Sequence, residues 1–201
     1  MQVPLFPLKT VLFPGGPLPL RIFETRYVDM ISQCMKDNGS FGVLLIQDGQ
    51  EAGTAASTYT IGTLARIVDF YQGSDGLLGV TAIGTHKFEL KSAERQDDGL
   101  NIGEIEILPS ETPMVLPQEY ASLAEILEAI LDDLGRLYED MERHLDDAGW
   151  VANRFMEILP IALEQKQMCL ERADCRQRLE IVAAVLEQVR LPAADDSPLA
   201  D

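Results

Sequence analysis

The sequence has no long apolar run, and this shortage argues against a membrane protein. The uninterrupted apolar stretches are short, for example residues 43–46, whereas a membrane-spanning helix needs about 20 apolar residues. The amino terminus has no basic segment before an apolar stretch, and three prolines fall within its first 14 residues, which argues against a secretory signal. We therefore expect a cytoplasmic protein that makes no membrane contact.

Cysteines and basic side chains are also scarce. Cys34, Cys169 and Cys175 are odd in number and contain no Cys-x-x-Cys pair, which is typical of reduced thiols rather than of disulfides or a zinc site. Lysine and arginine number 16 against 33 acidic residues, giving a formal net charge of −17. Such a charge repels polyanions, so the composition disfavours nucleic acid as a partner.

Sequence motifs that would indicate catalysis are missing as well. The chain contains no GxxxxGK[ST] phosphate loop, no HExxH zinc motif, no GxSxG nucleophile turn and no GxGxxG dinucleotide motif. His86 and His144 stand alone, and the adjacent aspartates at 97–98 belong to a predicted turn. We therefore predict no catalytic residue, no metal and no cofactor. A hydrolase whose catalytic groups meet only in space stays open as an alternative.

The first half of the chain, residues 1–112, is patterned mainly as strands. Pro4 and Pro7 predict a short extended segment at a sheet edge or bulge, because proline donates no ladder hydrogen bond. A helix is indicated by apolar positions at 27, 31, 34 and 35, ending at Asn38-Gly39. Strand-like runs follow at residues 41–46, 60–71, 77–83, 86–95 and 100–108. These features predict a mostly antiparallel sheet or a partly closed barrel.

The second half, residues 113–191, has helical periodicity. Apolar positions between Pro117 and Leu145 predict one long helix, or two helices separated near Gly135, with Gly149 as the stop. A shorter helix halted by Pro160, a third over residues 161–172 and a last helix capped by Asp174 follow. Residues 192–201 are rich in proline, alanine and aspartate, and we expect them to be disordered. The predicted fold class is α+β.

Several short motifs, in a fixed order, make the chain similar to a known family. They are PLFPL at 4–8, VLFPG at 11–15, LPLRIFE at 18–24, RY at 26–27, GTLA at 62–65, Gly84, KF at 87–88, LP at 159–160, KQ at 166–167, LE at 170–171, Asp174 and RL at 178–179. The chain resembles the N-terminal, substrate-binding domain of Lon ATP-dependent proteases over about residues 2–190.

This resemblance implies a PUA-like pseudo-barrel β subdomain followed by a helical bundle. It also implies a non-catalytic module that binds unfolded or partly folded protein segments, with a Lon-type protease as a possible partner. The sequence carries no ATPase motif, and we expect no peptidase domain. Because PUA-like folds elsewhere bind RNA, a nucleic-acid binder is a further alternative, which the net charge of −17 opposes.

The junction of the two predicted subdomains is the expected place for a peptide-binding groove. Trp150, Met156, Leu159 and Pro160 are the candidate peptide-binding residues, since they lie close together in the sequence. Core packing is the alternative explanation for Trp150, the single tryptophan. Within the amino-terminal signature, the expected core residues are Phe13, Leu20 and Phe23, and an ion network is expected among Arg21, Glu24 and Arg26.

Overall fold

The computed structural model describes residues 1–51, 57–73, 75–139, 141–172 and 174–190, so the tail predicted at 192–201 lies outside the described residues. The strands are β1 (Gln2–Leu8), β2 (Pro17–Ile22), β3 (Ser40–Asp48), β4 (Ser57–Thr58), β5 (Ile61–Gln72), β6 (Leu78–Arg95) and β7 (Asn101–Ile107). The helices are α1 (Thr25–Asp37), the 3-10 helix η1 (Gln118–Tyr120), α2 (Ala121–Leu134), α3 (Arg136–Glu139), α4 (Ala148–Ile158), α5 (Leu163–Glu171) and α6 (Cys175–Arg190).

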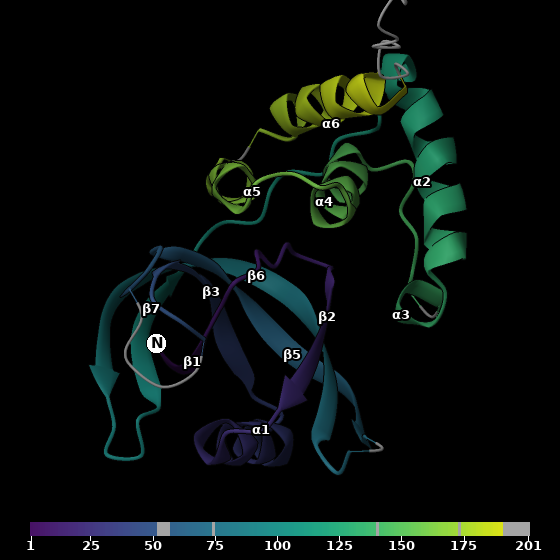
Figure 1. The fold of residues 1–201 in the computed structure, drawn as a ribbon. Helices are drawn as coiled ribbons and strands as arrows, with labels where there is room; N and C mark the ends of the chain where they lie inside the picture. Colours follow the sequence, from purple (N-terminus) through teal and green to yellow (C-terminus); the bar gives the residue numbers. More distant parts are fainter. Residues whose placement is uncertain (52–56, 74, 140, 173, 191–201) are drawn as a thin grey trace, which may run out of the picture.

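The β-strands form a closed barrel, in agreement with the predicted α+β class. The strand order is β1-β7-β6-β5-β3, and β1 then pairs with β3 to complete the circuit. The β1–β3 pairing is parallel, from Leu5↔Gly42 to Leu8↔Leu45, while the other pairings are antiparallel. Strand β2 lies off this circuit and pairs with the first half of β6. Figure 1 shows the helices α2 to α6 above one end of the barrel and α1 at the opposite end.

Each proline of β1 stands where only one neighbouring strand is paired. Pro4 pairs with Ile102 of β7, before the pairing with β3 begins at Leu5, and Pro7 pairs with Leu44 of β3, after the pairing with β7 has ended. The predicted edge position is therefore correct for each proline separately. It is wrong for the strand as a whole, because β1 connects β7 to β3 and closes the barrel.

Helix α1 covers the lower end of the barrel with one apolar face. Its buried side chains include Tyr27, Met30 and Ile31, and the Tyr27 ring stacks on Phe6 of β1 with 4.0 Å between centroids. Met35, expected on this face, is 40% exposed instead. The predicted end of the helix is confirmed, since Asn38 forms the C-cap in the left-handed region with φ 50°.

Strand β6 corrects the prediction of two separate strands at 77–83 and 86–95. The chain runs on as a single strand, Leu78–Arg95, which pairs with β2 and β7 along one side and with β5 along the other. Gly84, at the expected break, is where the Phe13 carbonyl oxygen passes close to the strand. A Cβ atom at Gly84 would lie 2.3 Å from that oxygen, so the glycine permits a close approach of two segments rather than a turn.

Of the two glycines predicted to interrupt helices in the second half, Gly135 does so and Gly149 does not. Helix α2 stops at Leu134 because Gly135 takes φ 65°, which was the second of the two predicted alternatives. Gly149 does not stop a helix, and that prediction was wrong. It lies in the first turn of α4, whose N-cap is Asp147, with the Asp147 carboxylate accepting the Trp150 N–H at 2.7 Å.

Two other predicted helix boundaries are confirmed. Helix α4 ends at Ile158, directly before the extended Leu159-Pro160 pair. The carboxylate of Asp174 accepts the backbone N–H groups of Arg176 and Gln177 at 2.9 and 3.2 Å, and so satisfies free donors at the start of α6.

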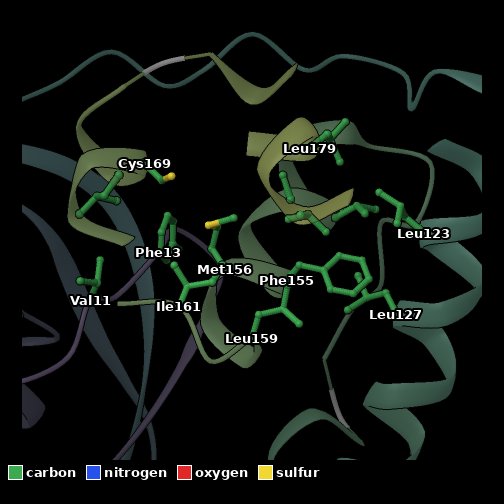
Figure 2. Close-up of a cluster of buried hydrophobic side chains, with 14 of the residues drawn as sticks. Val11, Phe13, Leu123, Leu127, Phe155, Met156, Leu159, Ile161, Cys169 and Leu179 are labelled. Atoms are coloured by element: carbon green, nitrogen blue, oxygen red, sulfur yellow. The ribbon is translucent and has the colours of Figure 1, made fainter. Parts of the chain in front are cut away.

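The barrel and the helices share a hydrophobic core at their junction. Figure 2 shows Phe13, from the β1–β2 connection, beside Met156 of α4, with Val11 at the left edge of the same cluster. Phe13 is 1% exposed and Phe155 of α4 is fully buried. Burying a phenylalanine side chain stabilises a fold by about 1.5–3 kcal/mol, so this core fixes the helices against the barrel. The exact division into subdomains at residue 112 stays a prediction.

Candidate functional site

A groove of about 540 Å³ opens where the barrel meets the helices, and we call it the seam groove. Its barrel side is formed by β1, by the β1–β2 connection and by the whole of β2. Its helical side is formed by α3, α4 and α5. The lining residues are Phe6, Leu8, Thr10, Val11, Leu12, Pro17, Leu18, Pro19, Leu20, Arg21, Ile22, Phe23, Glu24, Tyr27, Glu51, Leu137, Tyr138, Glu157 and Lys166.

The seam groove exists because two neighbouring strands of the barrel wall are not paired with each other in the described sheet. β2 extends the wall beside the first half of β6, and β7 takes the corresponding place beside the second half. β1 pairs with β7 only as far as Leu5. Residues Phe6 and Leu8 therefore border β2 across an interval without ladder hydrogen bonds, and both line the groove. The apolar side chains that border the interval, among them Phe6, Leu8 and Leu20, are each less than 10% exposed, and Phe23 at the end of β2 is the apolar side chain of this wall that is largely exposed.

Helix α3 supplies the apolar wall opposite β2. Figure 1 shows the short helix α3 at the lower end of α2, to the right of β2, and α3 and β2 are in contact. Leu137 is half-buried and the Tyr138 side chain is 7% exposed, so both present apolar surface at the groove. Burial raises the pKa of Tyr138, with a contribution from the nearby Glu157 carboxylate, so its hydroxyl stays neutral at physiological pH.

A charged cluster forms the floor between the groove and α4. Arg154 is fully buried and donates to the Pro14 carbonyl oxygen at 2.9 Å and to Glu157 Oε1 at 2.6 Å. Burial raises the pKa of Glu157 to about 7, although the Arg154 charge and hydrogen bond and the Lys166 charge lower it. Burial also lowers the pKa of Lys166, whose Nζ donates to the Glu157 carbonyl oxygen at 3.0 Å. This cluster anchors α4 to the turn that precedes β2.

The prediction that Phe23 lies in the core is wrong, and its true position matters for the site. It was expected in the core, but its side chain is 64% exposed and lines the seam groove. Phe13 and Leu20 are buried as expected. The predicted ion network is confirmed only for Arg26 and Glu24, which are 2.8 Å apart.

Arg21 does not belong to the predicted ion network with Glu24 and Arg26, because its side chain pairs with a residue of another connection. Its guanidinium forms an ion pair with Asp75, in the β5–β6 connection. The backbone N–H of Leu77 and the nearby Arg21 charge lower the pKa of Asp75, which therefore stays ionised. Both partners are about half exposed, so this pair orders the rim of the groove rather than its floor.

The four predicted peptide-binding residues do not form one open surface. Met156 is fully buried and Leu159 is 7% exposed, and both belong to the junction core. Pro160 is exposed at the end of α4. Trp150 is half-buried and its ring lies 5.6 Å from the Arg154 guanidinium, an arrangement that favours a cation–π contact. None of the four lines the seam groove, and their role in peptide binding stays a prediction.

Sequence reasoning missed β2 as the principal wall of a groove. Its alternation of buried and exposed residues is ordinary for a strand, with Leu18, Leu20 and Ile22 facing inward. The available signal was the pair of prolines at 17 and 19, because a strand with two prolines has to keep one edge unpaired. An unpaired edge beside exposed apolar side chains is a typical binding surface.

A second polar cluster lies elsewhere on the same junction. Arg178 of α6 is 1% exposed and forms an ion pair with Glu111. Lys87 of β6, also buried, lies 3.1 Å from Glu111 and donates to the Leu170 carbonyl oxygen at 3.2 Å. Gln167 of α5 donates to the Ile61 carbonyl oxygen at 2.9 Å. Several positions of the family motifs therefore join the barrel to the helices.

The described residues contain no group of three or more histidine, cysteine or carboxylate side chains that could hold a metal ion. Over the same part of the chain, every helix is too short or too polar to cross a bilayer. His86 is exposed on β6.

The structure is thus an α+β domain in which a closed barrel and a layer of helices enclose an apolar groove. Comparison with known proteins agrees with the family suggested by the sequence. The model of the ATP-dependent protease La (LON) substrate-binding domain matches residues 2–188. The chain belongs to this family.

Solved structures and curated relatives support the assignment. The Lon N-terminal domain protein from Xanthomonas campestris is 36% identical, covers 92% of this chain and 98% of its own, and superposes with a TM-score of 0.72. The N-terminal domain of the Mycobacterium avium complex Lon protease shares the fold, with a TM-score of 0.64 at 16% identity, covering 93% and 98%. The Lon protease of Anaeromyxobacter dehalogenans is 22% identical over 94% of this chain, which spans 23% of that relative.

Proposed function

We propose that this chain is a non-catalytic module that binds exposed apolar segments of unfolded or partly folded proteins in the seam groove. The observation that carries the proposal is the groove itself, with β2 on one side and α3 on the other. Its volume of about 540 Å³ lies within the range of about 300–1,000 Å³ that is usual for ligand sites. Its walls are mainly apolar, which suits segments that folded proteins keep buried.

The expected affinity is low. A segment that buries about 800 Å² in total gains on the order of 15–20 kcal/mol of gross apolar stabilisation. Lost rigid-body freedom costs an estimated 4–15 kcal/mol, and ordering a flexible peptide costs more. Dissociation constants in the micromolar range or weaker follow, which suit a module that samples many partners and releases them.

The comparisons support protein binding rather than chemistry as the role. The matched family is described as a substrate-binding domain, and the chain contains no phosphate-loop motif for ATP hydrolysis. Relatives called Lon protease carry a similar region within a longer chain. A Lon-type protease is accordingly the second partner that we propose.

Two exposed phenylalanines provide a matched test. Phe23 is 64% exposed and lines the groove, whereas Phe70 on β5 is 58% exposed and lies outside it. We expect Phe23→Ser to weaken binding of labelled unfolded client peptides about tenfold or more, as for a central aromatic contact, and Phe70→Ser to change it little. Fluorescence anisotropy titrations measure both, and a purified Lon-type protease can replace the peptide to test the second partner. Equal effects of the two substitutions, or no binding by the unsubstituted protein, would contradict the proposal.

A further inference from the structure

The edge of β2 that faces the seam groove is poor in hydrogen-bond donors. Just before β2, the Gly84 N–H donates to the Gly16 carbonyl oxygen at 2.9 Å, while the Gly84 carbonyl oxygen accepts the Gly15 N–H at 2.8 Å, so the hydrogen bonds to β6 at this end are made on either side of Pro17 and not by it. The register continues with Pro17 opposite Ile83. Because bonded and non-bonded pairs alternate in antiparallel ladders, Pro17 and Pro19 direct their nitrogen and carbonyl groups away from β6. Neither nitrogen carries a hydrogen, so that edge gains acceptors without donors.

The facing edge of β1 has the same property. Met1 and Ile105 exchange two hydrogen bonds of 2.8 Å, which makes them a bonded pair of the β1–β7 ladder. Odd-numbered residues of β1 therefore direct their backbone groups toward the β7 side. Beyond Leu5 that side is no longer paired with β7, and Pro7 falls there. The next donor on this side, the N–H of Lys9, is bonded to the Glu51 carboxylate.

The two edges together present an unbalanced hydrogen-bonding surface. Carbonyl oxygens of Pro7, Pro17, Pro19 and Arg21 point toward the groove, whereas Arg21 supplies the one free strand amide that β1 and β2 direct there. A peptide that added to either edge as a β-strand would bring its own carbonyl groups, and most would find no donor. A buried carbonyl left without a hydrogen-bond partner destabilises the complex, so strand addition is disfavoured.

The net charge of the molecule favours a cation, while the charged side chains of the groove wall are largely paired. Of the carboxylates that line the groove, Glu24 is ion-paired with Arg26, Glu157 is ion-paired with Arg154, and Glu51 accepts the Lys9 N–H. Of the two basic side chains that line it, Arg21 is ion-paired with Asp75, and Lys166 donates to the Glu157 carbonyl oxygen. The net charge of −17 therefore supplies the field that attracts a cation. A partner that brings N–H donors and positive charge matches both the carbonyl edges and the field.

We propose that the seam groove selects apolar segments that carry a lysine, an arginine or a free amino terminus, whose N–H groups bond to the carbonyl oxygens of Pro7, Pro17 and Pro19. This selectivity rests on the proposed function, because it describes which segments enter the same groove. The prolines are therefore specificity-determining residues. Backbone N–H donors at their positions would let a peptide of any sequence pair with the edge as a β-strand, and proline has no such donor.

Three peptides of one apolar sequence test the selectivity on the unsubstituted protein. They carry lysine, norleucine or glutamate at a single central position and a fluorescent label on the amino terminus, so that none of them has a free amino group there. Because hydrogen bonds to charged groups are stronger than those between neutral groups, we expect the lysine peptide to bind about tenfold more tightly than the norleucine peptide. The glutamate peptide is expected to bind most weakly. Equal affinities for lysine and norleucine would overturn the selectivity and leave the proposed function standing, whereas no binding by any peptide would overturn both.

Two proline substitutions separate donor count from charge. Pro19→Val adds an amide donor on the groove edge, so the norleucine peptide is expected to gain affinity and the lysine preference to shrink. Pro4→Val is the matched control, because Pro4 is an even-numbered residue of β1 and directs its nitrogen away from the groove side. An unchanged lysine preference in Pro19→Val would contradict the role of the prolines. Circular dichroism and thermal unfolding of both variants show that each remains folded.

Discussion

The junction between the barrel and the helices has two regions that use the same kinds of residue in opposite ways. In one region Arg178, Glu111 and Lys87 form a buried ionic cluster that ties α6, the β7–η1 connection and β6 together. In the other region β1 and β2 face each other without pairing, and the seam groove lies between them and α3. The first region pairs its charged side chains with one another, although Arg178 Nε has no hydrogen-bond partner, and the second leaves carbonyl oxygens and the exposed Phe23 side chain for a partner.

This difference shows how one junction can hold the helices in place and still leave a groove accessible to a partner. A buried ion pair contributes little net stability over an apolar replacement, but it fixes geometry because breaking it leaves a buried charge without a partner. The groove needs such support, since its helical wall is otherwise joined to β2 by few contacts. The Arg178–Glu111–Lys87 cluster therefore positions the seam groove. Substitutions in the cluster should change stability, and substitutions in the groove should change binding.

The largest expected effect comes from removing the buried Arg178–Glu111 ion pair. Arg178→Met removes a guanidinium that is 1% exposed and leaves Glu111 short of a partner, so we expect a loss of about 3–5 kcal/mol in the free energy of unfolding. Denaturant unfolding monitored through Trp150 fluorescence measures it. Arg176→Met is the matched control on the same helix, because the Arg176–Glu119 pair is exposed and such pairs contribute about 0–1 kcal/mol. Similar losses in both variants would contradict the distinction between the two regions.

A smaller effect is expected from the ionic cluster at the groove floor, and it depends on pH. The pKa of Glu157 is raised by burial to about 7, so the native state binds more protons than the unfolded state between about pH 4.5 and pH 7. The contribution of Glu157 to the free energy of unfolding is therefore greatest below pH 4.5 and is lost as the pH rises to 7. Arg154, Lys166 and Tyr138 face this carboxyl group.

Glu157→Gln should remove this pH dependence. We expect the difference in unfolding free energy between the original protein and the variant to change by on the order of 1–3 kcal/mol across that interval, with the original protein losing stability relative to the variant as the pH rises. Unfolding curves at several pH values measure the difference. A difference that is constant with pH, or one that changes in the opposite direction, would contradict the buried position of this carboxyl group.

Local features of the fold were largely predictable from the sequence, because they depend on neighbouring residues. Asn38 and Asp174 identified the end of α1 and the start of α6 through their backbone preferences and hydrogen bonds. The role of each glycine was harder to predict. Gly84 and Gly149 both suggest the end of a strand or helix, yet Gly84 permits the close approach of Phe13 to β6, and Gly149 lies within the first turn of α4.

The candidate site was less predictable, since it depends on contacts between distant segments. The parallel pairing of β1 with β3 closes the barrel across residues far apart in the chain, and no local pattern indicates it. Phe23 and Leu137 meet at the groove only because β2 and α3 are brought together by the junction. Phe23 directly follows β2, where an apolar residue is usually buried, so its exposure could be established only in three dimensions.

The most direct test of the account is to locate a bound peptide by NMR. Backbone amide and methyl resonances of the labelled protein would be followed while the apolar lysine peptide is added. The account predicts that shifts concentrate at Leu18, Arg21, Phe23 and Leu137, which line the seam groove, with little change at Met168 on the outer face of α5. Shifts that concentrate around Met168 and α6, with the β2 resonances unchanged, would contradict it.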